Sequence, residues 1–305
     1  MRAVRIHKFG GPDVLQLDDI PRPQAADGKL LIRVAAASVN PVDYKIRRGG
    51  YPLVGEKDLP YTLGRDVAGT LEMAAAGFDQ GAEVYAHLDW ADGGYADYAL
   101  CAPSGVAAKP ATLSMVEAGA VPLAATTAWQ GLFDHGRLKA GQRVLIHGAS
   151  GAVGAFAVQF ARVAGAYVIG TASGDEIERV RRLGASEVID YKAQRFEQVV
   201  SDIDLVFDLI GGETLQRSFA VLRRGGALIS TVDEPDAARA AQAGVTASRY
   251  RAQPNAEQLS KIARLIDSKQ VEVTLAKVFG LDAATEAHRF LEQGHPHGKV
   301  VLRVD

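Results

Sequence analysis

The segment from Val144 to Gly154 constrains the fold of this chain more than any other. It begins with an apolar run, Val144–Ile146, that is typical of a buried parallel strand, and a turn of small residues follows. After the turn, apolar residues recur at helical spacing, at Val153, Phe156, Ala157 and Phe160. A strand, a glycine-rich turn and a helix in this order are the context of a dinucleotide-binding fingerprint.

The fingerprint G-x-G-x-x-G has Ala149, Gly151 and Gly154 at its three glycine positions in this chain. One glycine lets the chain turn, one lets the backbone approach a pyrophosphate, and one lets the helix pack on the strand. The helix N-terminus then offers N–H groups and the positive end of its dipole to the phosphates. Because alanine replaces the first glycine, the alternative is a glycine-lined turn in an ordinary α/β sheet.

The region 124–270 alternates strand-like runs with amphipathic helices. After a strand at 143–149, five more are predicted, at 166–173, 187–191, 204–210, 226–232 and 245–250. This alternation predicts a doubly wound α/β (Rossmann) domain with a parallel sheet of six strands. Helices are predicted at both ends of the region, over 117–133 and 257–266.

The region 1–123 has a different pattern, in which short apolar runs are separated by glycines and prolines. Strands are predicted at 3–6, 14–17, 30–36, 67–73, 82–87 and 95–100. Short strands at regular spacing favour a β-barrel or a sandwich. The tail, 271–305, returns to strand, helix and strand at 272–279, 283–291 and 299–304, and we expect it to complete this first domain.

Composition excludes several classes of function. A net charge of −2 at pH 7 argues against nucleic acid or a membrane surface as the main partner. No secretory signal pattern and no long uncharged apolar run is present. The single cysteine, Cys101, excludes an internal disulfide framework and fits a reducing compartment, so we expect a cytoplasmic protein.

Six segments carry motifs of a known family and occur in the order of that family. They are Asn40–Lys45, Leu63–Gly69, Gly93–Tyr98, Gly148–Gly154, Phe207–Gly212 and Gly298–Leu302. On these motifs the chain resembles the medium-chain dehydrogenase/reductase superfamily, in particular its zinc-free quinone and enone (alkenal) reductases. The resemblance covers essentially the whole chain. It implies a GroES-like β-barrel catalytic domain joined to the Rossmann domain, an active site in the cleft between them, and a homodimer.

The resemblance also implies that no zinc is bound. In the zinc alcohol dehydrogenases of this superfamily, a cysteine, a histidine and a second cysteine hold the catalytic metal. This chain has Asn40, Arg65 and a residue near Leu123 at those positions, and the arginine would repel the cation. The pair His295 and His297 has no third ligand nearby, so we expect no metal site there either.

Without zinc, hydrogen-bond donors must stabilise the charge that develops on the substrate oxygen, and one donor is typically worth about 3 kcal/mol. The resemblance implies Lys45, Tyr51 and Asn40 as donor candidates, with Asn40 and Tyr51 facing the cleft, whereas Asp43 orients its neighbours. From the residues alone, alternatives stay open. Asn40 can simply end a strand, Tyr51 can be a turn aromatic, and Lys45 can belong to a solvated charged face.

For the cofactor, the resemblance implies contacts at three places. Thr127, Gly211 and Val232 lie on the nicotinamide side, and Ser173 and Tyr191 match positions beside the 2′-phosphate of NADPH. The turn under the pyrophosphate supplies Gly148, Ser150, Gly151, Ala152, Val153 and Gly154. Many relatives have a lysine where this chain has Ile177, but the small Gly174 leaves room for a phosphate. NADPH is therefore expected, with NADH as the alternative.

The expected activity is NAD(P)H-dependent, zinc-independent transfer of hydride to quinones or α,β-unsaturated carbonyls. One alternative is a cofactor-binding structural or RNA-binding protein like the lens zeta-crystallins, which are similar in fold. The acidic balance argues against RNA. Another alternative is a metal-free alcohol dehydrogenase, which an assay with simple alcohols would distinguish.

Overall fold

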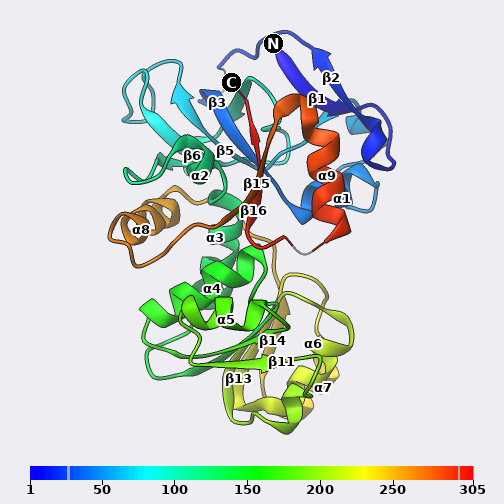
Figure 1. Ribbon diagram of the computed structural model, residues 1–305, viewed down its shortest axis with the longest axis vertical. Helices are drawn as coiled ribbons and strands as arrows, with labels where there is room; N and C mark the ends of the chain where they lie inside the picture. The colour runs from blue at the N-terminus through cyan, green and yellow to red at the C-terminus, as the bar shows by residue number, and fades with distance from the viewer. Residues whose placement is uncertain (26–27, 295, 305) are drawn as a thin grey trace. The chain divides into compact units, whose positions relative to one another are not determined.

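The computed structural model describes residues 1–25, 28–294 and 296–304, and it divides into two compact units (Figure 1). Unit 1 comprises Met1–Leu123 and Gln253–Asp305, and unit 2 comprises Ala124–Ala252. Among the described residues, no helix is both long enough and apolar enough to cross a membrane.

Unit 2, all of whose residues are described, forms a six-stranded parallel sheet. Its strands follow one another across the sheet as β11 (Glu187–Asp190), β10 (Tyr167–Ala172), β9 (Arg143–His147), β12 (Ile203–Asp208), β13 (Leu222–Ser230) and β14 (Thr246–Arg249). The order changes direction at β9, so the carboxyl ends of β9 and its neighbours form the switch point at which such sheets bind ligands. The predicted doubly wound sheet is confirmed.

Four α-helices connect these strands, as the alternating pattern predicts. They are α4 (Ala152–Val163), α5 (Glu176–Arg182), α6 (Gly212–Ser218) and α7 (Ala237–Ala243). Helix α4 buries Phe156, Ala157 and Phe160, the face that its periodicity predicts, and it packs on β9 and β10. Apolar strand residues such as Leu145, Ile169 and Val206 form the core beneath the helices.

The helix predicted over 117–133 is three pieces in the structure. Helix α2 (Met115–Gly119) ends before Pro122, which begins α3 (Pro122–Trp129). Proline has no N–H to donate to the preceding turn but fits the first turn of a new helix, so it separates the two. A π-helical stretch, Gln130–His135, then follows α3.

The described strands of unit 1 pair antiparallel, except for two strands of its tail that pair in parallel. Its described residues form a three-stranded sheet in the order β2 (Leu15–Asp19), β1 (Arg2–Ile6) and β4 (Tyr61–Thr62). They also form a seven-stranded sheet that runs β15 (Leu275–Gly280), β16 (Lys299–Arg303), β3 (Leu30–Val39), β5 (Asp66–Leu71), β6 (Glu83–His87) and β8 (Val106–Ala108), with β7 (Tyr98–Cys101) also paired to β3. Buried residues such as Ile32, Val67 and Leu302 form its core.

Three further helices belong to unit 1, namely α1 (Pro41–Arg47), α8 (Ala256–Asp267) and α9 (Ala284–Gln293) (Figure 1). The sequence predicts a domain boundary at residue 270, but the contacts set it after Ala252, so that α8 joins unit 1. The reason is that α8 packs on β8, and the Tyr85 hydroxyl donates to the Leu259 carbonyl oxygen over 2.6 Å.

Candidate functional site

The glycine turn that follows β9 has the backbone geometry of a nucleotide-binding loop. Gly148 has a φ of +71°, in the left-handed region that favours glycine, and Gly151 is the N-cap of α4. A Cβ at Gly154 would lie 2.1 Å from the Gly148 carbonyl oxygen, so only glycine lets the helix approach the turn this closely. Ser150, Ala152 and Val153 complete the turn and the start of the helix. Its first N–H groups have no acceptor within the helix.

Ala149 takes the first glycine position of the fingerprint without strain. Its side chain is fully buried and faces Gly170 on β10, where an added Cβ would lie 2.9 Å from the Ala149 Cβ. Gly170 thus provides the space that the alanine occupies. The sequence analysis missed Gly170, and a glycine in an otherwise apolar strand was the signal for a close approach.

The other cofactor candidates of unit 2 follow the carboxyl ends of its strands. Ser173 and Gly174 follow β10, Tyr191 follows β11, Gly211 follows β12, and Val232 comes shortly after β13. Gly174 has a φ of +57° and no atom within 4 Å of an added Cβ, and the Tyr191 side chain is exposed. A positive helix end and open glycine backbone on one edge of a parallel sheet fit the pyrophosphate and ribose groups of a dinucleotide.

Thr127 lies on α3 and is connected to the same sheet. Its carbonyl oxygen accepts a hydrogen bond from the hydroxyl of Tyr250, which comes directly after β14. The Thr127 side chain is nearly buried.

Arg179 brings a positive charge to the glycine turn that the sequence analysis did not single out. Its Nη1 donates to the Ser150 carbonyl oxygen over 3.0 Å and pairs with Glu176 over 3.1 Å. Arg179 lies on α5, two residues after Ile177. Its position shortly after the end of β10 was the signal that could have identified it.

Two buried titratable groups at the strand ends are structural. His147 contacts the Ser218 hydroxyl over 3.0 Å and the Thr171 hydroxyl over 3.4 Å, and burial lowers its pKa to about 3, so the ring is neutral. Asp208 accepts hydrogen bonds from the Gly211 N–H and the Ser230 hydroxyl, and burial raises its pKa. Asp208 thereby holds the loop that follows β12, whereas His147 connects the end of β9 to β10 and α6.

In unit 1, Asn40 belongs to a buried polar network. Its Nδ2 donates to an Asp66 carboxylate oxygen over 3.0 Å and to the Ser38 hydroxyl over 3.1 Å, while Lys299 Nζ donates to its Oδ1. Lys299 also pairs with Asp66 over 3.6 Å. Burial lowers the pKa of Lys299, and the two carboxylates of Asp66 and Asp43 oppose that shift. Because both its Nδ2 and its Oδ1 are hydrogen-bonded, the orientation of the Asn40 amide is fixed.

Asp43 lies one turn into α1 and is fully buried. Its carboxylate accepts hydrogen bonds from the Asn40 N–H over 2.7 Å, the Gly64 N–H over 3.1 Å and the Tyr95 hydroxyl over 3.1 Å. Burial raises the pKa of Asp43 to about 6, against the effect of these hydrogen bonds. The structure thus brings Asn40 and Asp43 together.

Lys45 and Tyr51 are less buried than that pair. Lys45 is on α1 but exposed, whereas Asp43 on the same helix is buried. Tyr51 is half-buried and stacks on Trp90, with ring centroids 5.0 Å apart. The Arg65 guanidinium lies over the Trp90 ring, with Cζ 3.8 Å from its centroid. Trp90 was missed in the sequence analysis, which offers no spacing rule that links it to Tyr51.

At the three positions where zinc dehydrogenases have their metal ligands, this chain has residues with other interactions. Asn40 is bonded as described, Arg65 is a buried cation, and the Leu123 N–H donates to Asp66. Burial lowers the pKa of Arg65, and its Nε and Nη1 have no hydrogen-bond acceptor among the described residues. The described residues contain no group of three or more His, Cys, Asp or Glu side chains that could hold a metal ion. His295, one of the histidine pair considered above, lies outside the described residues.

Two family models match the chain. One is described as "Alcohol dehydrogenase GroES-like domain" and matches residues 26–111, and the other, "Zinc-binding dehydrogenase", matches residues 183–302. The chain is 39% identical to the quinone oxidoreductase of Pongo abelii over 243 residues, which span 75% of this chain and 72% of that protein. The chain belongs to the quinone oxidoreductase family of the medium-chain dehydrogenase/reductase superfamily.

Other relatives match over nearly the whole of this chain. The 2-methylene-furan-3-one reductase of Solanum lycopersicum is 32% identical over 321 aligned positions, which cover 99% of this chain and 79% of that protein. The crystal structure of the Escherichia coli quinone oxidoreductase complexed with NADPH matches with a TM-score of 0.89 and 26% identity, and it covers all of both chains. The resemblance found in the sequence motifs is confirmed.

Proposed function

We propose that this member of the quinone oxidoreductase family is an NADPH-dependent, zinc-independent reductase of quinones or α,β-unsaturated carbonyls. The observation that carries the proposal is the glycine turn from Gly148 to Gly154 at the switch point of a six-stranded parallel sheet. Support comes from the full-length match to an NADPH-complexed quinone oxidoreductase and from the match to an enone reductase.

The bound nicotinamide would supply the hydride, a chemistry that belongs to the cofactor and not to the protein. The chain's own residues would bind and orient it. The turn at Gly151 would receive the pyrophosphate, Thr127, Gly211 and Val232 would contact the nicotinamide side, and Ser173 and Tyr191 would contact the 2′-phosphate. We favour NADPH over NADH because Gly174 leaves open space there and no acidic side chain ends β10.

On the substrate side, donors in unit 1 would stabilise negative charge on the substrate oxygen. Tyr51 is the strongest candidate, because it is half-buried and its ring is held against Trp90. The Asn40 amide is engaged by Lys299 and Asp66, and Lys45 is exposed, so both would act as supporting groups. Asp43 would orient α1 and Tyr95 rather than donate a proton, since its oxygens accept three hydrogen bonds.

Steady-state assays of NADPH oxidation test the proposal, with 1,4-benzoquinone and a 2-alkenal as substrates and simple alcohols with NADP⁺ as the comparison. We expect turnover with at least one of the two electron-poor substrates and none with the alcohols. Bound cofactor without turnover of either substrate would refute the enzymatic proposal. Turnover of alcohols alone would favour a metal-free alcohol dehydrogenase.

We also propose that the protein is a homodimer in the cytoplasm, as the family resemblance and the single cysteine indicate. Sedimentation velocity at micromolar concentration tests the first point. A single species at the monomer mass of 32.4 kDa would contradict the dimer.

A further inference from the structure

Helix α3 does not continue as a regular α-helix after Trp129. In the π-helical stretch Gln130–His135, the Gly136 N–H donates to the Gly131 carbonyl oxygen over 2.9 Å, a bond that spans five residues instead of four. Such widened turns form where another group enters the hydrogen-bond ladder of a helix.

The hydroxyl of Tyr250 reaches the backbone of α3 at the turn just before this stretch. It donates to the Thr127 carbonyl oxygen, and the Gly131 N–H donates to the tyrosine oxygen. In a regular α-helix this carbonyl and this N–H would bond to each other, because they are four residues apart. The Tyr250 hydroxyl therefore contacts both groups of one helical hydrogen-bonding pair.

Packing fixes the position of that hydroxyl. Tyr250 is 6% exposed, its N–H donates to the Ser230 carbonyl oxygen over 3.1 Å, and its ring stacks on Phe207 and on His135. Burial raises the pKa of Tyr250 well above its ordinary value, so the hydroxyl stays protonated and remains a donor.

Gly131 makes the arrangement sterically possible. An added Cβ at this position would lie 2.4 Å from the Phe207 ring and 2.6 Å from the Tyr250 hydroxyl oxygen. The glycine thus leaves room for the tyrosine to reach the helix backbone.

We propose that Tyr250 is a positioning residue for the nicotinamide end of the cofactor, because it ties the backbone of Thr127 to the carboxyl edge of the sheet. The inference rests on the proposed function, in which Thr127 contacts the nicotinamide. Without the hydroxyl, the Thr127 carbonyl oxygen is no longer bonded to the residue that follows β14. Thr127 can then move relative to the strand ends that bind the rest of the cofactor.

The test compares two ligands in the Tyr250→Phe variant. One is NADPH, and the other is 2′-phospho-ADP-ribose, which has every group of the cofactor except the nicotinamide. Calorimetric titration should show NADPH binding weakened by roughly tenfold, the equivalent of one hydrogen bond. Binding of 2′-phospho-ADP-ribose should be unchanged, because its sites at the glycine turn and after β10 and β11 do not involve Thr127.

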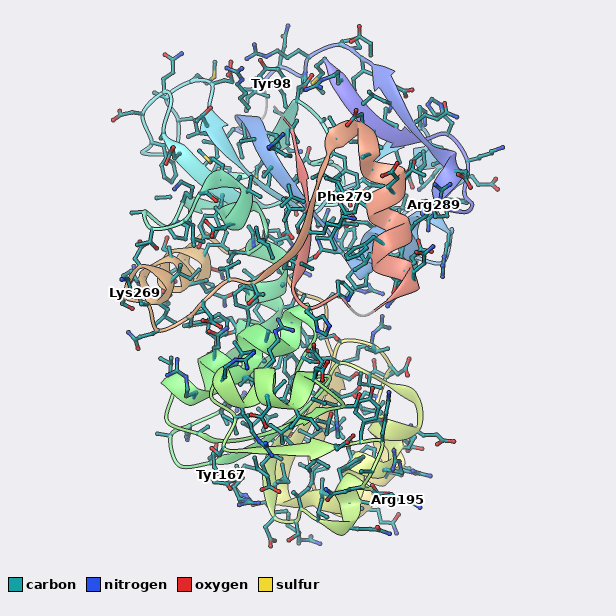
Figure 2. All side chains as sticks on the ribbon, viewed as in Figure 1. Tyr98, Tyr167, Arg195, Lys269, Phe279 and Arg289 are labelled. Atoms are coloured by element: carbon teal, nitrogen blue, oxygen red, sulfur yellow. The ribbon has the colours of Figure 1, made fainter. Side chains whose placement is uncertain are left out.

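Tyr167→Phe is the matched control, since it removes a hydroxyl from an exposed tyrosine on β10 of the same unit (Figure 2). It should leave both affinities unchanged. Equal weakening of both ligands in Tyr250→Phe would mean that the tyrosine only stabilises the unit, and unchanged NADPH binding would mean that it does not position Thr127. Either result overturns the inference. A wild-type protein that binds neither NADPH nor NADH would instead refute the proposed function.

Discussion

Ionisation of the buried Asp43 carboxyl group lowers the stability of the folded protein. Its ordinary pKa is 3.8, and burial raises that value to about 6 in the folded protein. The unfolded chain therefore loses this proton at lower pH than the folded chain does. The group contributes stability at low pH, and that contribution is lost as the pH rises from about 4 to about 6, by up to about 3 kcal/mol.

The Asp43→Asn variant should reveal this dependence. The substitution alters three hydrogen bonds and so adds a constant cost, but it removes the titrating group. The unfolding free energy of the wild type minus that of the variant should therefore fall by about 3 kcal/mol between pH 4 and pH 7. Urea unfolding at four pH values measures it, and Asp79→Asn at an exposed site controls for the loss of one charge. A pH-independent difference would contradict the prediction.

Tyr51 offers a test of substrate stabilisation at a single atom. Tyr51→Phe keeps the ring that stacks on Trp90 but removes the hydroxyl donor. We expect kcat/KM for 1,4-benzoquinone to fall by up to about 100-fold, the value of one donor to a developing oxyanion. Tyr98→Phe is the control (Figure 2), because it removes the hydroxyl of another half-buried tyrosine, whose ring packs against Arg22 with Cζ 4.1 Å from the ring centroid. An unchanged kcat/KM would remove Tyr51 from the site.

The two glycines at the start of α4 should respond differently to alanine. At Gly151 an added Cβ has only the Gly148 carbonyl oxygen nearby, at 3.4 Å, and φ is −69°. Gly151→Ala should therefore change stability by less than about 1 kcal/mol. It should still weaken NADPH binding by at least about tenfold, because the methyl group occupies the side from which a pyrophosphate approaches.

Gly154→Ala should, in contrast, mainly lower the stability of the protein. Its Cβ would meet backbone atoms at 2.1 Å, so we expect a loss of about 3 kcal/mol in unfolding free energy. Urea unfolding and NADPH titration on both variants measure the contrast. Unimpaired NADPH binding by Gly151→Ala would argue against the cofactor at this turn.

At the scale of elements, Lys299 connects strands that are distant in sequence. It extends from β16 to Asn40 at the end of β3 and to Asp66 at the start of β5. Asp66 in turn accepts the N–H of Leu123 in the first turn of α3. The buried Lys299 ammonium thus contacts both the Asp66 carboxylate and the Asn40 amide, and these two groups lie at the ends of β5 and β3.

Removing that buried cation should cost more than removing an exposed one. Lys299→Met leaves the buried Asp66 carboxylate without its counter-ion, so the unfolding free energy should fall by about 3 kcal/mol. Lys277→Met on the neighbouring strand β15 is the control, because that lysine is exposed, with its Nζ 4.8 Å from the centroid of the Phe279 ring. Its cost should stay below about 1 kcal/mol. Equal effects of the two variants in urea unfolding would contradict the buried network.

Periodicity was sufficient to predict the strands of the parallel sheet and the buried face of α4, because both follow from local spacing. It did not predict the break before Pro122, although proline carried that signal. It could not predict the bond from Tyr250 to the backbone of α3 beside the π-helical stretch, because Tyr250 is remote in sequence from Thr127. For the same reason, pairings such as Tyr51 with Trp90 and Ala149 with Gly170 became visible only in the structure.

At the scale of the whole molecule, the sequence did not show which domain contains α8, because that too depends on contacts with residues remote in sequence. Its amphipathic pattern predicts a helix with one buried face, with Leu259, Ile262 and Ile266 inside. The pattern does not specify which core receives that face. The packing on β8 and the bond from Tyr85 to Leu259 decide in favour of unit 1.

The charges of unit 1 lead to a prediction about metal. Two buried carboxylates, Asp43 and Asp66, lie among two buried cations, Arg65 and Lys299, so the charge that zinc would balance is already balanced. A divalent ion at this position would meet a guanidinium that cannot be deprotonated. Zinc binding should therefore be unfavourable, and catalysis should not depend on it.

Dialysis against EDTA should accordingly leave kcat and Tm unchanged, and elemental analysis should find far less than one zinc per chain. A zinc-dependent alcohol dehydrogenase treated in parallel shows that the chelation works. Saturating NADPH should, by contrast, raise the unfolding free energy by about 3 kcal/mol at one hundred times its Kd. Activity that disappears with EDTA and returns with Zn²⁺ would mean that the metal binds despite Arg65, and the charge argument would then be wrong.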